Sequence, residues 1–200
     1  TEVTDDSTNS IVSFTSEGTG KSGRWVAISR QSSAALYSED GDSWTSFNMP
    51  IAADWENVVG GNNMFVAFAK SDTLGNPTNT YAYSMNGEDW NLGVLPGTAV
   101  WTGVAFGNGV FVAVSETNNI AVVSNNGIDW RRSDIPEFGD STLNLWQDIT
   151  YGQAKFVAIA NSNKLSVEGS YNVNTGLIDW ETHIMDVVAD STQLDWVSVA

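Results

Sequence analysis

Short apolar runs recur along the chain at nearly even intervals. The runs at residues 25–28, 65–68, 111–114 and 156–159 each combine aromatic and β-branched side chains. Runs of this length and composition are typical of buried β-strands. No apolar period of 3.6 residues is sustained between helix-capping residues, so the pattern indicates no long helix. We therefore expect an all-β chain of short strands.

Each run occupies the same place in a longer repeated unit. In three copies a tryptophan stands ten residues before the phenylalanine of the run, and a glycine stands four residues before it. The tryptophans are Trp55, Trp101 and Trp146, and the glycines are Gly61, Gly107 and Gly152. Trp25 begins a fourth copy of the run, Trp196 is a fourth leading tryptophan, and all nine tryptophans fall on repeat positions. The repeat length of roughly 40–50 residues is that of a propeller blade.

A turn followed by tryptophan closes each unit. Asn-Gly or Asp-Gly between strand-like runs is a strong hairpin signal, and Asp and Asn both offer an acceptor to backbone N–H groups. We expect a structural role for the turn residues Ser38, Asp40, Gly41 and Trp44; Ser84, Asn86, Gly87 and Trp90; Ser124, Asn126, Gly127 and Trp130; and, in a looser fourth copy, Gly176 and Trp180.

We interpret each unit as four antiparallel strands, A to D. The fold class that follows is an all-β β-propeller of four-stranded antiparallel blades, with about four blades, either complete or a fragment of a larger propeller. Residues 1–8 are expected to form an N-terminal tail, and residues 9–200 a single domain with four repeats. A glycine turn joins strand A to strand B at one end of the blade, and the Asp-Gly or Asn-Gly turn joins C to D there.

Two arrangements of the ring agree with the sequence. In the first, residues 196–200 are a complete strand A that pairs with the strand holding Trp25, which closes a four-bladed ring. In the second, residues 9–15 are a degenerate strand A of the first blade, and residues 196–200 begin a further blade. We favour the first, because the leading tryptophan is missing at Asn9 and an unclosed sheet edge promotes aggregation.

The turn from Ser38 to Trp44 resembles the Asp-box of sialidase-like propellers, also called the BNR repeat. The segment 107–114 is similar to repeats of phage tail and bacterial surface proteins in that superfamily. The resemblance covers residues 9–200. It implies a propeller fold, with turn side chains that cap backbone N–H groups. For function and location, it implies a virion tail or fibre component, or an extracellular or cell-surface recognition protein.

The charge balance excludes some partners. The chain has 24 Asp and Glu against 8 Lys and Arg, a formal net charge of −16, which repels nucleic acid and anionic membrane surfaces. No apolar run approaches the ~20 residues of a membrane helix, and no signal peptide is visible. Cysteine is absent, which excludes thiolate metal sites. We expect no cofactor and no metal.

Catalytic motifs are weak. The glycine-rich segment 18–23 partly matches a phosphate loop, but a strand follows it where that motif needs a helix, so we interpret it as an A–B turn. A sialidase would need an arginine cluster, and Arg24, Arg30, Arg131 and Arg132 do not fall at equivalent loop positions. His183 is the only histidine and is expected on the surface or packed in a strand. We predict that the protein is not an enzyme.

The B–C and D–A loops vary most in length between the units. Variable loops on a rigid scaffold often carry recognition. We predict a non-catalytic binding or structural module that meets a protein or a cell-surface glycan, within a virion or surface assembly, through Lys70, Asp72, Glu116, Asn118, Glu137, Phe138 and Lys164. The alternatives are a glycan-cleaving enzyme with two carboxylates and a protein-docking assembly factor, as among the photosystem II assembly propellers that carry Asp-boxes.

Overall fold

The computed structural model describes residues 8–14, 23–117, 119–137, 145–161, 165–185 and 199–200. These residues form strands, turns and loops, and no helix among them is long and apolar enough to cross a membrane. The strands are β1 (Thr8–Phe14), β2 (Arg24–Ser29), β3 (Ser32–Ser38), β4 (Trp44–Gly61), β5 (Met64–Ser71), β6 (Thr78–Ser84), β7 (Asn91–Ala99), β8 (Trp101–Gly107), β9 (Val110–Ser115), β10 (Ala121–Ser124), β11 (Arg131–Arg132), β12 (Trp146–Gly152), β13 (Lys155–Ala160), β14 (Leu165–Asn172) and β15 (Leu177–Ile184).

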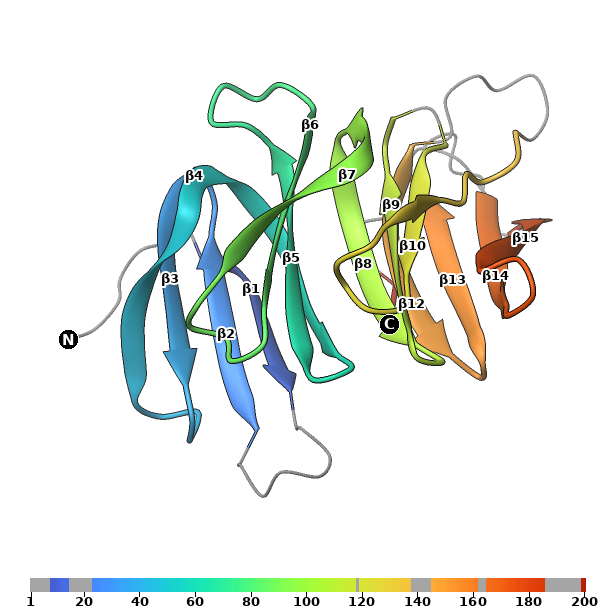
Figure 1. The fold of residues 1–200 in the computed structure, drawn as a ribbon. Coiled ribbons are helices and arrows are strands. Elements are labelled where there is room, and N and C mark those ends of the chain that lie inside the picture. Colours follow the sequence, from blue (N-terminus) through green and yellow to red (C-terminus); the bar gives the residue numbers. More distant parts are fainter. Residues whose placement is uncertain (1–7, 15–22, 118, 138–144, 162–164, 186–198) are drawn as a thin grey trace.

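The strands form four consecutive antiparallel units of four strands. Blade one is β1–β4, blade two is β4–β7, blade three is β8–β11 and blade four is β12–β15. The long strand β4 belongs to two blades, because its first part pairs with β3 and its last part with β5. Figure 1 shows the blades following one another from the blue β1–β3 to the orange and red β13–β15. The predicted all-β propeller of four-stranded blades is confirmed.

The inner strands stand beside one another in the order β1, β4, β8 and β12. Asn57 Nδ2 donates to Thr102 O at 2.8 Å, and Thr102 Oγ1 donates to Trp146 O at 2.6 Å, so hydrogen bonds join three successive blades near the axis. Each of these inner strands packs against the next one in this order. Among the described strands, the first and the last of them, β1 and β12, do not pack against each other. The described strands of the four blades therefore form an open arc and not a closed ring.

The closed four-bladed ring that the sequence favoured is wrong. It required residues 196–200 to pair with the strand that holds Trp25. That strand, β2, instead pairs with β1 on one edge, from Thr8 to Phe14, and with β3 on the other. Val199 N donates to Asp148 Oδ2 at 2.9 Å, which places Val199 beside the inner strand of blade four. Trp196 and the glycine-rich segment 18–22 lie outside the described residues.

Three hydrophobic clusters fill the spaces between neighbouring blades. Trp55, Trp101 and Trp146 are fully buried in these clusters, one in each. Every one of their indole N–H groups has an acceptor: Ile51 O at 3.2 Å, Thr78 O at 2.9 Å and Asn119 Oδ1 at 2.9 Å, respectively. These bonds are favourable because an unpaired polar group in a core is costly, and among the described residues the indole N–H groups of Trp90 and Trp130 are buried without an acceptor.

The repeated glycines admit aromatic rings from the next blade. The Phe106 ring occupies the place that a Cβ at Gly61 would take, with Phe106 Cγ at 2.2 Å, and the Tyr151 ring does the same at Gly107, with Tyr151 Cγ at 2.0 Å. Both glycines end a strand, and the left-handed residues of the A–B turns follow them, such as Asn62 (φ 48°) and Asn108 (φ 49°). The sequence analysis placed these glycines in the A–B turn itself. In the structure, glycine is required at Gly61 and Gly107 because an aromatic ring of the next blade lies where a Cβ would be.

Candidate ligand-binding cleft

The C–D turns of the first three blades share one hydrogen-bond pattern. In blade two, Ser84 Oγ accepts from Gly87 N at 2.8 Å, and Asn86 Oδ1 accepts from Glu88 N at 3.0 Å and Asp89 N at 2.8 Å. Equivalent bonds close the turns at Ser38 and Ser124. The Ser, Asp and Asn side chains named from the sequence in these three turns thus cap backbone N–H groups, as their chemistry predicts.

The turn of blade four uses a residue that sequence reasoning missed. Asn172 Oδ1 accepts from Asn174 N at 3.0 Å and from Thr175 N at 3.3 Å. Gly176 has φ +70°, like the turn glycines of the other blades, and its N–H donates to Asn172 O. One extra residue separates Gly176 from Trp180, so alignment on the glycine hides the capping asparagine. In the strand register Gly169, not Asn172, stands where the other blades have Ser38, Ser84 and Ser124, so the repeat gave no signal for the capping asparagine.

The choice between Asp and Asn in these turns depends on the residue before the tryptophan. Asn126 Nδ2 donates to Asp129 Oδ2 at 2.8 Å, and Asn86 makes the same bond to Asp89. In blade one the equivalent of Asp129 is Ser43, and there the capping residue is Asp40. Donation from the N–H groups of Ser43 and Asp42 and from the Ser38 hydroxyl lowers the pKa of Asp40 to about 2. An aspartate is therefore placed where no second carboxylate would oppose it.

Asn126→Asp should accordingly destabilise the protein at neutral pH by roughly 1–2 kcal/mol, because it replaces a donor with a charge beside Asp129. The repulsion acts only while both carboxylates are charged. The deficit should therefore shrink as the pH falls through the range in which aspartate is protonated, about 3.9 in model peptides. Urea unfolding at a series of pH values measures this.

The double variant Asn126→Asp with Asp129→Ser recreates the pair found at Asp40 and Ser43. At neutral pH, the double variant should be nearly as stable as the single variant Asp129→Ser, because no second carboxylate then opposes the new aspartate. A deficit of Asn126→Asp that is unchanged by pH and by the second substitution would contradict the electrostatic explanation.

The C–D turns of blades two, three and four are each held by the preceding blade. Arg24 Nη1 donates to Asn86 O at 2.5 Å, Asn62 Nδ2 to Asn125 O at 2.9 Å, and Arg131 Nη1 to Thr175 O at 3.0 Å. These bonds join blades one to two, two to three and three to four. They fix the backbone at this end of the molecule, so a site built from these turns is preorganised.

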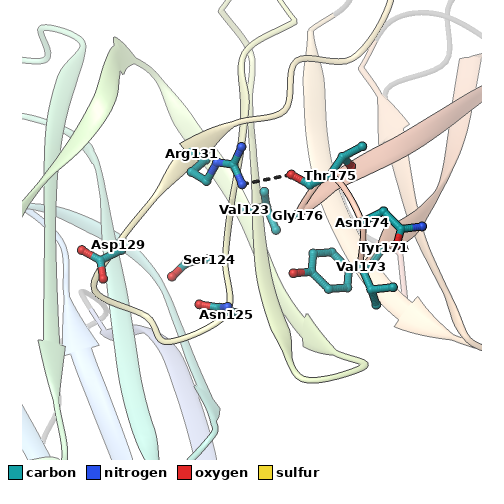
Figure 2. Close-up of a pocket in the computed structure, with 10 residues that line it drawn as sticks. All are labelled: Val123, Ser124, Asn125, Asp129, Arg131, Tyr171, Val173, Asn174, Thr175 and Gly176. Carbon is teal, nitrogen blue, oxygen red and sulfur yellow. Dashed lines mark hydrogen bonds between the residues drawn. The ribbon is translucent and has the colours of Figure 1, made fainter.

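A cleft of about 320 Å³ lies at this end between blades three and four. Figure 2 shows the side chains that line it, with Arg131 on one side bonded to the blade-four turn and Tyr171 on the other. The lining is Val123, Ser124, Asn125, Asp129 and Arg131 from blade three, and Tyr171, Val173, Asn174, Thr175 and Gly176 from blade four. Apart from the valines, it offers amides, hydroxyls, a carboxylate and a guanidinium.

Arg131 is the distinctive group of this cleft. A Cβ at Gly176 would lie 2.6 Å from Arg131 Nη1, so the glycine makes room for the guanidinium. Its neighbour Arg132 forms an ion pair with Asp134, with Arg132 Nη2 2.5 Å from Asp134 Oδ2. Arg131 takes part in none of the ion pairs of the described residues. Apart from the bond to Thr175 O, its guanidinium N–H groups have no acceptor among the described residues. A second pocket, of about 310 Å³ beside Tyr37, differs because Arg24 there pairs with Glu39 and Glu88.

The loop-end residues predicted from the sequence lie apart from this cleft. Lys70 is the second-last residue of β5, Asp72 is in the loop that follows, Glu116 follows β9 and Glu137 follows β11. Asp72 Oδ1 accepts from Leu74 N and Asn76 N of its own loop, and its bonds to Asn76 chiefly lower its pKa, so it organises that loop. Asn118, Phe138 and Lys164 lie outside the described residues.

The same end holds an ion pair that the sequence did not indicate. Arg30 Nε and Nη2 bind the two carboxylate oxygens of Asp54 at 2.8 and 3.0 Å, and Asp54 is only 4% exposed. This pairing lowers the pKa of Asp54 and raises that of Arg30. It joins the B–C turn of blade one to the inner strand of blade two, which indicates a structural role.

Comparison with known proteins bears on the fold. No family model matches the chain, and no curated protein matches it. Among solved structures, it is similar to virginiamycin B lyase from Staphylococcus aureus, with 11% identity, a TM-score of 0.64 and coverage of 80% of this chain and 52% of the other. The fold is a β-propeller.

Two further solved structures agree with it. YCF48 from Cyanidioschyzon merolae is 14% identical with a TM-score of 0.53, and the match covers 80% of this chain and 55% of that one. NanB sialidase from Streptococcus pneumoniae is 15% identical with a TM-score of 0.51, over 77% and 28% of the two chains. The propeller chain thus spans about half the length of the first two structures and less of the sialidase. At these identities the likeness shows the architecture alone.

Proposed function

We propose that this propeller is a non-catalytic recognition module that binds a saccharide in the cleft between blades three and four. The observation that carries the proposal is the position of Arg131. Its guanidinium is fixed between two rigid turns by its bond to Thr175 O, yet it keeps unused donors that face the cleft. Of the described Lys and Arg residues, Arg131 and Lys70 form no ion pair, whereas the other four do: Arg24, Arg30, Arg132 and Lys155.

The other lining groups suit a hydroxyl-rich ligand. Asn125 and Asn174 are exposed amides, each with donors and acceptors, and Asp129 supplies a carboxylate acceptor. Tyr171 is half-buried against the core, so its ring presents a rigid apolar surface with a hydroxyl at one edge. The volume lies at the small end of ligand pockets, of roughly 300–1,000 Å³, and suits one or two sugar rings.

A binding role is supported over glycoside cleavage by the composition of the lining. Most glycosidases flank the scissile bond with two carboxylic acids. The described cleft lining includes one carboxylate, Asp129, which accepts a hydrogen bond from Asn126. The location that we propose, a virion or a cell surface, follows from the Asp-box resemblance of the turns.

A glycan array followed by titration of the best ligand tests this proposal. Arg131→Gln should weaken binding at least about tenfold, because a charge-assisted hydrogen bond contributes about 1.5–3 kcal/mol. Arg132→Gln is the matched control, because it removes the same charge from the neighbouring residue, which forms an ion pair with Asp134 and does not line the cleft. It should leave the affinity for the ligand within about twofold of wild type.

Three outcomes would contradict it. Equal affinity of wild type and Arg131→Gln would remove this cleft from consideration. Loss of binding in Glu116→Gln or Glu137→Gln, with Arg131→Gln unaffected, would move the ligand to the loop end. Release of sugar from the bound glycan over time would show an enzyme.

A further inference from the structure

The face of blade four that points away from blade three differs from its counterparts. In each blade one residue of strand C stands opposite the central valine of strand B. These residues are Tyr37, Tyr83 and Val123 in blades one to three, and Glu168 in blade four. The first three pack into the clusters shared with the next blade. Blade four places a charge at the same position.

Three potential metal ligands meet on this face. Glu168 stands directly opposite Glu181 in the β14–β15 ladder, and His183 lies two residues further along β15 on the same face. One ligand atom from each of the three lies within 4.8 Å of the other two, and His183 Nε2 is 4.0 Å from Glu168 Oε1. Like charges directly opposite in a ladder destabilise it, so this pair favours a cation between its members.

Lys155 supplies part of that positive charge. Its ammonium group forms an ion pair with Glu168 Oε1, and this bond lowers the pKa of Glu168. A carboxylate has lone pairs for more than one partner, so Glu168 can accept from Lys155 and still bind a metal. In metal sites, ligating carboxylates are commonly held by such a second hydrogen bond.

We propose that Glu168, Glu181 and His183 form a Zn²⁺ site, with water in the remaining position. One imidazole nitrogen and two carboxylate oxygens form a donor set that zinc accepts in sites with an open position. Ligand atoms on a tetrahedral zinc lie roughly 3.3–3.4 Å apart, as follows from bonds of about 2.0–2.1 Å. Glu181 and His183 are exposed and Glu168 is half-buried, so the side chains can close this distance without disturbing the core. None of the three lines the saccharide cleft, so this site is independent of that proposal.

Calorimetric titration of the 200-residue chain with ZnCl₂ in a non-chelating buffer tests the site. Wild type should show one saturable site per chain. His183→Gln and Glu181→Gln should each weaken zinc binding at least about tenfold. Glu137→Gln is the matched control, because it makes the same charge change at an exposed acid outside the cluster, and it should bind zinc like the wild type.

Thermal unfolding without metal should give similar midpoints for all four proteins, which shows that the variants fold. With zinc present, the midpoint should rise for wild type and Glu137→Gln, and stay unchanged for His183→Gln. Weak, unsaturable binding that is the same in all four proteins would overturn the proposal, because the general acidity of the surface would then explain it. Loss of binding in Glu137→Gln alone would overturn it too.

Discussion

Trp146→Ala is expected to remove roughly 3–5 kcal/mol from the free energy of unfolding, a large share of the roughly 5–15 kcal/mol that is typical of folded proteins. Trp146 is 0% exposed and lies in the cluster between blades three and four. Truncation leaves a cavity between two sheets, and Asn119 Oδ1 loses the indole N–H that it accepts at 2.9 Å. Urea denaturation followed by circular dichroism measures the change.

Trp44→Ala is the matched control for this substitution. Trp44 has the same side chain on another repeat position, but it is 37% exposed at the start of β4. Its loss should cost less than half as much, since less apolar surface returns to water and no buried cavity forms. Equal losses for the two tryptophans would show that the space between blades three and four is not the packed core described above.

The second large effect is expected at Gly107, where alanine should cost roughly 2–3 kcal/mol. The added methyl group would lie 2.0 Å from Tyr151 Cγ, so the ring must move. Tyr151 is held against Phe156, with ring centroids 4.8 Å apart, so moving it disturbs the packing within blade four as well. The loss should appear as a lower urea midpoint without a change of slope.

Gly152→Ala provides the comparison. Gly152 has the same repeat position in blade four, and among the described residues nothing lies within 4 Å of a Cβ placed there. Alanine at that position should be neutral or slightly stabilising, because it restricts the unfolded chain. If Gly152→Ala were as damaging as Gly107→Ala, the repeated glycine would be required by its own backbone rather than by the ring of the next blade.

The local parts of the molecule could be predicted from the sequence. Strand positions follow from short apolar runs such as residues 111–114, and the hairpins follow from Asp-Gly and Asn-Gly dipeptides. Their chemistry is contained within a few consecutive residues: Ser84 and Asn86 bond N–H groups two or three positions away. The length of a blade could be predicted as well, because the tryptophans recur once per repeat at the same position.

The cleft and the proposed zinc site could not be predicted in this way. Arg131 and Gly176 lie 45 positions apart, and Glu168 and Glu181 lie 13 apart. Only the packing of blade four on blade three, and the register of β14 with β15, brings each set together. A register shift of one residue would send Glu181 to the opposite face of the sheet, and no single-sequence pattern fixes register that closely.

The sequence by itself determined the repeat, the strands, the turns and the buried tryptophans, because short-range chemistry and apolar periodicity set all four. Tertiary structure alone decided that β1 pairs with β2, that the four blades form an open arc, and that Gly107 receives the Tyr151 ring. These depend on which surfaces meet across blades, and that choice is made by the shape and burial of whole sheets rather than by the preference of any local segment.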